Sequence, residues 1–242
     1  MTNARLTRPA MKFCGITRAA DAWAAADLGA AAIGFVFAPA SPRAITPEAA
    51  RVIAVTLPPF LQRVGVFVDV PAAEVRRVAE HVGLDVVQLH GAETPADAAA
   101  AWPRVIKALA RSREPLADAA AWPEAVTLLI DAASGDAPGG TGQLADWPAA
   151  AAVARRRRVV LAGGLTADNV GEAITIVRPY AVDVSSGIEI RPGVKSASRM
   201  RAFAWAVEAA VSRNDQERDD EGRHDDDAGE GGRPAGVRPA RS

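Results

Sequence analysis

The sequence is poor in the residues that build covalent and metal cross-links: it contains one cysteine and three histidines among 242 residues. One cysteine permits no disulfide within the chain, so a reducing compartment such as the cytoplasm is the expected setting. Residues 1–10 contain no apolar segment typical of a secretory signal. No run of about eighteen apolar residues is present, so the sequence predicts no membrane span.

Charge of one sign is also lacking, because the formal net charge is only −1. This balance argues against general nucleic-acid binding. The basic run 155–158 lies between a helix-like stretch and an apolar run, and we interpret it as a solvated helix end. The scattered histidines lack the spacing of metal ligands, so we expect no metal site.

Residues 213–242 differ in composition from the rest of the chain. They hold acidic clusters at 219–221 and 225–227, several glycines and almost no apolar residues. Such a segment buries too little surface to offset the entropy of ordering it, so the sequence predicts disorder here. A solubilising tail is favoured over a partner-binding one. The expected organisation is a leader at 1–10, one folded domain at 11–212 and this tail.

Short apolar runs recur along the folded part, each followed by a helix-like stretch. There are eight of them, at 11–15, 31–37, 63–69, 86–91, 105–110, 127–132, 158–164 and 181–187. Spacings of roughly 20 to 30 residues are typical of βα units with a parallel sheet. We therefore predict an α/β fold, a single (β/α)₈ TIM barrel. An open doubly wound sheet is the alternative, weakened because no G-x-G-x-x-G follows the first run.

Helix-start signals fit the same register. Thr46-Pro47-Glu48 places a capping residue, a first-turn proline and an acid in order. Thr94-Pro95, Asp146-Trp147-Pro148 and the stretch 166–169 predict further helix starts in the same way.

Active-site groups of such a barrel lie at the carboxyl ends of its strands. The predicted strand ends carry polar or glycine residues: Cys14, the Arg43 loop, Asp69, Gln88 with His90, Asp131 before the glycine-rich stretch 139–142, Gly163-Gly164, and Asp183 with Ser185-Ser186-Gly187.

The last two predicted strands suggest a phosphate site. Gly163, Gly164, Ser185, Ser186 and Gly187 offer free backbone N–H groups and hydroxyls where barrel enzymes commonly hold phosphate. The alternative is that the two glycines only make a tight turn.

Cys14 and Asp131 are expected on opposite sides of the same rim. A thiolate and a carboxylic acid facing one pocket suggest acid–base chemistry. Asp131 could instead be a structural carboxylate that accepts backbone hydrogen bonds. Acyl transfer would need a base beside Cys14, and only His90 is a candidate.

Arg43 lies in a Pro-Ala-Ser-Pro-Arg loop that would hold it stiffly. Its guanidinium group could grip a carboxylate with two hydrogen bonds. The alternative is a surface charge on a mobile loop.

The motifs taken together resemble the phosphoribosylanthranilate isomerase family of tryptophan biosynthesis. They are KFCGITR, GFVFAPASPR, VGVFVD, VQLHG, LLIDA, PGGTGQLADW, LAGGLTADNV and VDVSSGIEIRPGVKS. The resemblance runs in order from about Met11 to Val211. The resemblance implies a (β/α)₈ barrel that uses no metal or organic cofactor. It also implies an Amadori rearrangement of N-(5-phosphoribosyl)anthranilate to 1-(2-carboxyphenylamino)-1-deoxyribulose 5-phosphate.

The same resemblance implies roles for individual residues. Cys14 would be the general base, Asp131 the general acid and Arg43 the ligand of the anthranilate carboxylate. The glycines and serines after the last two strands would bind the phosphate. Gln88 and His90 would line the pocket without a chemical step.

Lys12 precedes Cys14 by two residues on the same strand face. It could tune the thiol, but we expect it to form an ion pair with an acid such as Asp183. Basic surroundings would lower the pKa of Cys14 and make the thiolate accessible.

The sequence leaves two alternative functions open. One is the related histidine-pathway isomerase, which resembles a two-fold repeated barrel with an aspartate on strand 1 and two phosphate sites. The other is a silent barrel that binds a phosphorylated metabolite or, through its tail, a protein. The expected partner is a small phosphorylated substrate, not nucleic acid or membrane, and the expected assembly is a monomer or homodimer.

Overall fold

The computed structural model describes residues 8–109, 114–131 and 146–227, and for 213–227 it describes the backbone alone. The predicted leader therefore lies largely outside the described residues, and so do the glycine-rich stretch 139–142 and the end of the tail.

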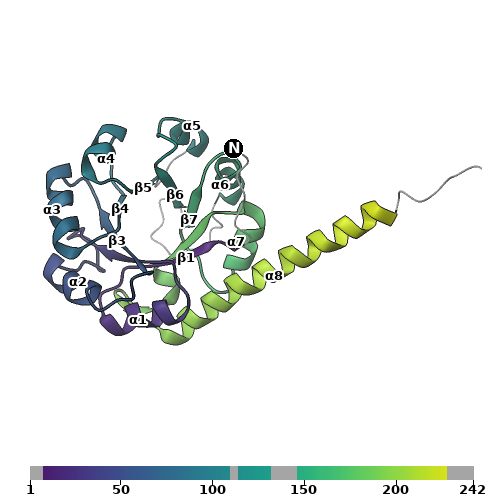
Figure 1. The fold of residues 1–242 in the computed structure, drawn as a ribbon, viewed down its shortest axis with the longest axis horizontal. Coiled ribbons are helices and arrows are strands. Elements are labelled where there is room, and N and C mark those ends of the chain that lie inside the picture. Colours follow the sequence, from purple (N-terminus) through teal and green to yellow (C-terminus); the bar gives the residue numbers. More distant parts are fainter. Residues whose placement is uncertain (1–7, 110–113, 132–145, 228–242) are drawn as a thin grey trace, which may run out of the picture.

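Eight parallel strands close into a barrel in chain order, so the predicted fold class is confirmed (Figure 1). The strands are β1 (Ala10–Cys14), β2 (Ala32–Val36), β3 (Gln62–Phe67), β4 (Val86–Leu89), β5 (Val105–Ala108), β6 (Thr127–Asp131), β7 (Val159–Ala162) and β8 (Ala181–Val184). Each of the eight apolar runs overlaps one of them; β1 and β3 begin one residue before their runs, and several runs extend past the end of their strand.

Helices surround the barrel and cover its outer face (Figure 1). They are α1 (Ala19–Asp27), α2 (Pro47–Ala54), α3 (Ala72–Val82), α4 (Pro95–Ala101), α5 (Pro115–Ala120), α6 (Trp147–Ala154), α7 (Val170–Val177) and α8 (Ala197–Asp227). Large side chains such as Phe13, Phe35 and Phe67 are fully buried between strands and helices.

The barrel interior is filled by a separate, smaller set of side chains. One cluster comprises Ala108, Leu129, Val160, Ala162 and Ala181. Because successive residues of a strand face opposite sides, Lys12 and Cys14 lie inside the barrel while Phe13 lies outside it. Alternation on β1 thus positions the only cysteine in the barrel mouth.

Three predicted helix starts are confirmed by their caps. The Thr46 hydroxyl accepts a hydrogen bond from the Ala49 N–H, and Asp146 accepts one from Ala149. Thr94 and Asp97 form a reciprocal capping box at α4. In the stretch 166–169 the Asn169 side chain bonds backbone groups of the turn before α7, rather than capping the helix.

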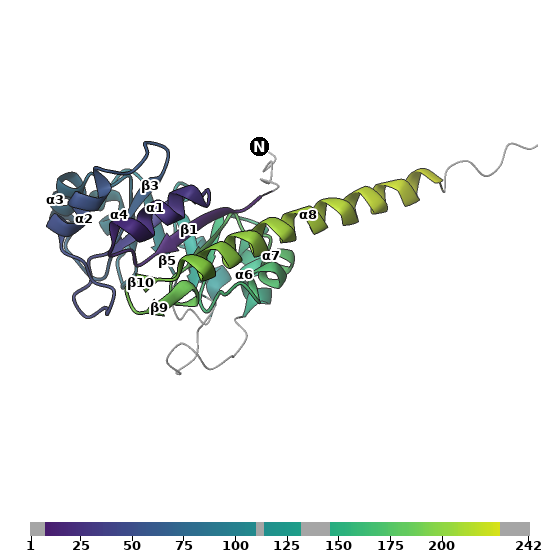
Figure 2. The ribbon, with the colours of Figure 1, turned by 90° about the horizontal axis from the view of Figure 1, so that it is seen from below.

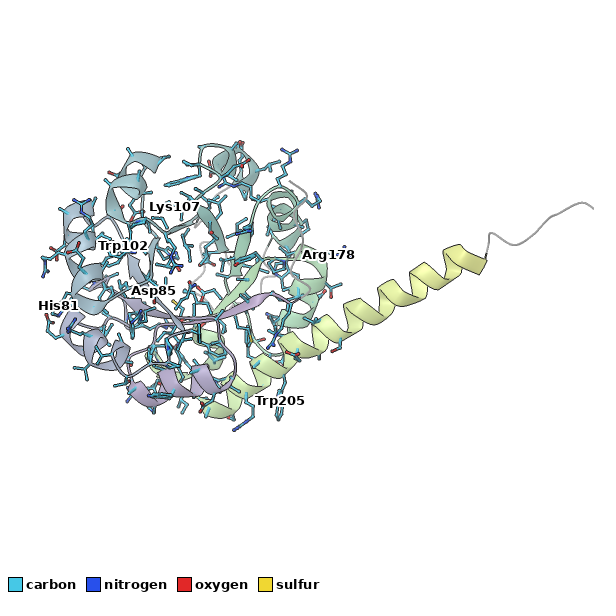
Figure 3. All side chains as sticks on the ribbon, viewed as in Figure 1. His81, Asp85, Trp102, Lys107, Arg178 and Trp205 are labelled. Atoms are coloured by element: carbon cyan, nitrogen blue, oxygen red, sulfur yellow. The ribbon has the colours of Figure 1, made fainter. Side chains whose placement is uncertain are left out.

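Helix α8 continues to Asp227, well past the expected boundary at residue 213 (Figure 1). The expected domain boundary at 212 thus falls inside a helix. A helix can continue past the folded domain because each residue added to it also adds a backbone hydrogen bond. Trp205 points away from the barrel and is 68% exposed (Figure 3). No described helix combines the length and hydropathy needed to cross a membrane.

A short antiparallel hairpin, not predicted from the sequence, follows β8. It comprises β9 (Glu189–Arg191) and β10 (Val194–Lys195), and a 3-10 turn, η1 (Ser186–Ile188), precedes it (Figure 2). Gly193 makes the turn with a φ of +77°. The Thr17 hydroxyl donates to the Gly193 carbonyl, which joins the hairpin to the loop after β1.

The basic run 155–158 is only partly the solvated helix end that we expected. The Arg157 guanidinium group donates to four backbone carbonyls, those of Ala119, Trp122, Pro123 and Val126. It therefore anchors the connection between α5 and β6, because a fork of five donors satisfies carbonyls that the helix end leaves open.

Candidate active site

Cys14 ends β1 and is almost fully buried in the barrel mouth. Gly34 lies beside it on β2, in register with it. A Cβ atom added at Gly34 would lie 2.8 Å from the Cys14 Sγ atom, closer than such atoms approach in proteins. The thiol thus occupies space that only a glycine on the neighbouring strand leaves open.

Lys12 and Asp183 form an ion pair inside the barrel, with Nζ 2.7 Å from Oδ2, as we expected from the sequence. Burial acts to lower the pKa of Lys12, but the nearby Asp183 and Cys14 outweigh it and raise that pKa. The ammonium group therefore stays charged beside the thiol.

The direction expected for the shift of the Cys14 pKa is wrong. Burial raises the pKa of the Cys14 thiol, and the opposing effect of Lys12 does not overcome it. Asp183 raises this pKa further, whereas Lys195 lowers it. Desolvation of the thiolate outweighs the basic surroundings.

Several charged groups lie close enough to His90 to affect its pKa. Burial lowers its pKa; Asp131 and Asp183 raise it, while Lys12 opposes them. Its Nδ1 atom lies 3.3 Å from the Gln88 amide nitrogen. His90, which directly follows β4, therefore lies within electrostatic range of Asp131 at the end of β6 and also of the Lys12–Asp183 pair.

Asp131 is the last residue of β6 and is half-buried at the barrel rim. This is the predicted place, because carboxyl ends of barrel strands open into the active site. The loop that follows it lies outside the described residues. The role of Asp131 as general acid stays a prediction at this point.

The predicted phosphate segments lie next to each other. Gly163 and Gly164 have φ values of +87° and +63°, which favour glycine. A Cβ atom at Gly187 would overlap the carbonyl oxygen of Leu165, so the loops after β7 and β8 touch through their backbones. The Ser185 hydroxyl donates to the Cys14 carbonyl at 3.1 Å, which connects this region to β1.

Arg43 is not a loose surface charge. Its Nε atom donates to Glu189 Oε1 at 2.9 Å, and its Nη2 atom donates to Oε2 at 2.7 Å. A Cβ atom at Gly15, whose φ is +75°, would lie 2.6 Å from the Arg43 Cδ atom. Arg43 therefore lies against the residue that follows Cys14.

A comparison with protein families gives an independent assignment. The family model described as "N-(5'phosphoribosyl)anthranilate (PRA) isomerase" matches residues 11–206. A Pelobacter propionicus protein named N-(5'-phosphoribosyl)anthranilate isomerase is 50% identical over 193 residues, covering 80% of this chain and 92% of its own length. The chain belongs to the phosphoribosylanthranilate isomerase family. It is thus an isomerase of tryptophan biosynthesis, as the motifs indicated.

Solved structures of the family agree. The phosphoribosylanthranilate isomerase of Thermotoga maritima superposes with a TM-score of 0.77 at 41% identity, covering 83% of this chain and 99% of that chain. A second isomerase structure, in complex with reduced 1-(o-carboxyphenylamino)-1-deoxyribulose 5-phosphate, has a TM-score of 0.74 at 40% identity, with the same coverage. The family match displaces both the histidine-pathway isomerase and the silent barrel as primary assignments.

Asp69, one of the polar residues expected at the strand ends of this isomerase, connects two loops. Its backbone is left-handed, with a φ of +52°, and its carboxylate accepts the Ala92 N–H at 2.7 Å. Glu93 accepts the Asp69 N–H and pairs with the buried Lys107, which extends from β5 (Figure 3). This network fixes the loops after β3 and β4 beside His90. No cluster of three or more metal-ligating side chains occurs in the described parts of the chain.

Proposed function

We propose that this isomerase converts N-(5-phosphoribosyl)anthranilate to 1-(2-carboxyphenylamino)-1-deoxyribulose 5-phosphate with Cys14 as general base and Asp131 as general acid. The observation that carries the assignment is their placement at the carboxyl ends of β1 and β6 of one closed barrel. His90 lies within electrostatic range of Asp131 and of the Lys12–Asp183 pair beneath Cys14, which supports a common pocket.

Ring opening comes first in the proposed sequence. Asp131 donates its proton to the ribose ring oxygen while the bond from that oxygen to C1′ breaks. The electron pair of the anthranilate nitrogen forms a Schiff base with C1′. Protonating the leaving oxygen makes this cleavage feasible, as general acid catalysis requires.

Proton abstraction follows. The Cys14 thiolate takes the proton from C2′, and the electron pair left behind forms the C1′–C2′ double bond of an enolamine. Tautomerisation of the enolamine gives the ketone at C2′. C2′ is oxidised and C1′ reduced within the same molecule, so no external redox agent is needed.

The cations around the thiol support this role. The Lys12 and Lys195 charges both act to lower the pKa of Cys14, although burial outweighs them. A thiolate formed in this setting is a stronger base than an ordinary one because its proton affinity is higher. No cofactor takes part in the proposed steps.

Recognition groups surround the reacting centre. Arg43 binds the anthranilate carboxylate, and Gly163, Gly164 and the 185–187 segment bind the phosphate through backbone N–H groups and hydroxyls. The Gln88 Oε1 atom is buried without a hydrogen-bond partner among the described residues. Because such an atom is costly to leave unsatisfied, we assign Gln88 to a substrate hydroxyl, with His90 beside it.

The decay of phosphoribosylanthranilate fluorescence on adding protein tests the function. We expect Cys14→Ala and Asp131→Asn each to lower kcat by about 10²–10⁴-fold, because each removes one proton-transfer group. Circular dichroism and the thermal midpoint serve as folding controls. Normal turnover without the Cys14 thiol would refute the base assignment, and normal turnover of Asp131→Asn would refute the acid assignment.

The setting of the enzyme follows from the same reasoning. A single cysteine and a biosynthetic small-molecule reaction fit a cytoplasmic enzyme that acts as a monomer or homodimer. Light scattering on the purified chain distinguishes the two assemblies.

A further inference from the structure

Glu189, in the unpredicted hairpin after β8, is bonded to two cations of the site. Its carboxylate is buried and receives the Arg43 Nε and Nη2 hydrogen bonds on its two oxygens. The Oε1 atom also accepts from Lys195 Nζ at 2.8 Å and from the Gly193 N–H at 3.1 Å. Burial acts to raise the pKa of Glu189, but the bonds from Arg43 and Lys195 outweigh it and keep that pKa low.

The edge of Arg43 that Glu189 occupies is the decisive detail. A guanidinium group carries five N–H donors in a rigid plane and can engage a carboxylate along either of two edges. Glu189 takes the edge made by Nε and Nη2, which fixes the plane of the group. The other edge, formed by Nη1 and Nη2 at the end of the side chain, lies in the same plane and can bind a second carboxylate. A carboxylate partner on the first edge therefore orients the second.

Lys195 connects the Glu189 carboxylate, through Ser185, to the end of β1 where Cys14 lies. Its side chain is fully buried, and its ammonium group donates to the Ser185 carbonyl at 3.2 Å as well as to Glu189. The Ser185 hydroxyl in turn donates to the Cys14 carbonyl. Glu189 thus lies between the residue proposed to hold the substrate carboxylate and the backbone that carries the proposed base.

We propose that Glu189 is a positioning residue for carboxylate recognition: it holds Arg43 in the orientation that binds the anthranilate carboxylate. Without it, the two cations would repel each other and Arg43 would lose the partner that fixes its plane. The inference rests on the proposed function, because it deepens the role given there to Arg43.

The test compares two ligands that differ by one group. One is reduced 1-(o-carboxyphenylamino)-1-deoxyribulose 5-phosphate, and the other is the same compound without the carboxylate. The ratio of their dissociation constants measures what the carboxylate contributes. A bond between charged groups should make this ratio about 10- to 100-fold in the unmodified protein.

We expect Glu189→Gln to bring the ratio close to that of Arg43→Lys, with little change for the ligand that lacks the carboxylate. The double variant should resemble Arg43→Lys alone, because both changes remove the same interaction. Glu189→Asp keeps the charge but is too short to reach both cations in place. It should also lower the ratio, and it serves if the glutamine variant does not fold.

A matched control exists at the opposite end of the barrel. Arg63 donates from Nε and Nη2 to the two oxygens of Asp85, through the same edge of the guanidinium group, where β3 and β4 begin. Asp85→Asn should lower the thermal midpoint but leave the ligand ratio at its original value. A merely structural role of Glu189 predicts the same behaviour for Glu189→Gln.

The outcomes separate the two levels of proposal. If the unmodified protein does not isomerise phosphoribosylanthranilate, the proposed function fails. If it does, but the ratio is unaffected in both Glu189 variants, or both ligands lose affinity equally, the positioning role is overturned. A ratio near one in the unmodified protein also overturns it, because Arg43 would then hold no carboxylate.

Discussion

Lys12 and Asp183 are ion-paired inside the barrel, across the neighbouring strands β1 and β8 and two residues below Cys14. The two charges act on the thiol in opposite directions: Lys12 lowers the pKa of Cys14 and Asp183 raises it. Both side chains are buried, so neither charge is screened by water as it would be at the surface. The pair therefore affects both the stability of the barrel and the basicity of the thiol.

Breaking this pair should shift the pKa of Cys14 in a direction that depends on which partner is removed. Lys12→Met should raise it and Asp183→Asn should lower it. Because Cys14 is the only cysteine, the ultraviolet absorbance of the thiolate titrates this one site in the whole protein. Shifts of the same sign in the two variants would contradict the assignment.

Stability should change in both variants as well. Removing one partner of a buried pair costs about 3–5 kcal/mol, because the remaining charge is left uncompensated. The double variant Lys12→Met with Asp183→Asn should be less destabilised than the sum of the single variants. Denaturant unfolding measures this coupling, and strict additivity would mean that the two groups do not interact.

The pH dependence of kcat/KM should follow the free enzyme's Cys14. Its folded-state pKa lies above the ordinary value, so the thiolate increases only above about pH 8.5, and kcat/KM should rise with pH there. His90, whose pKa is lowered by burial, stays neutral near pH 7 and should add no limb between neutral pH and that rise. Stopped-flow measurements over this range test both statements. A plateau reached below pH 8 would show that another group is the base.

Much of the barrel could be predicted because its strands are apolar runs of the expected length at regular spacing. The Lys12–Asp183 pair could also be predicted, since both residues end up on inward faces of neighbouring strands. The hairpin that carries Glu189 could not, because its strands are too short to show a period of two. The boundary at residue 213 was placed by composition, which does not register a helix continuing from a folded segment.

One compositional signal for the buried charges was present in the sequence. Only three of its 28 basic residues are lysines, namely Lys12, Lys107 and Lys195. All three are buried and paired with a carboxylate. A compact ammonium group fits sites where the planar guanidinium fork does not. In an arginine-rich chain, a rare lysine is therefore a useful marker of a buried ion pair, although it does not identify the partner.

Deleting residues 213–242 should leave kcat and KM unchanged. The family match ends at residue 206, and the Thermotoga maritima isomerase is covered to 99% by only 83% of this chain. A truncation after Ser196 is the contrasting variant, because it also removes Phe203 and Val207, which are fully buried against the barrel. We expect that protein to be unfolded or insoluble. A large loss of turnover in the shorter deletion would make the tail part of the enzyme.

A pair of strand glycines separates effects on the thiol from effects on packing. A Cβ atom added at Gly34 would lie 2.8 Å from Cys14 Sγ, inside the barrel. One added at Gly65 would overlap Leu84 and lie 2.9 Å from Phe67, outside the barrel. Gly34→Ala should therefore displace the thiol, lowering kcat and altering the thiolate titration. Gly65→Ala should lower the free energy of unfolding by about 1–3 kcal/mol through overpacking, with the titration of Cys14 unchanged. Equal effects of the two variants on the titration would show that the position of the thiol does not depend on the space that Gly34 leaves.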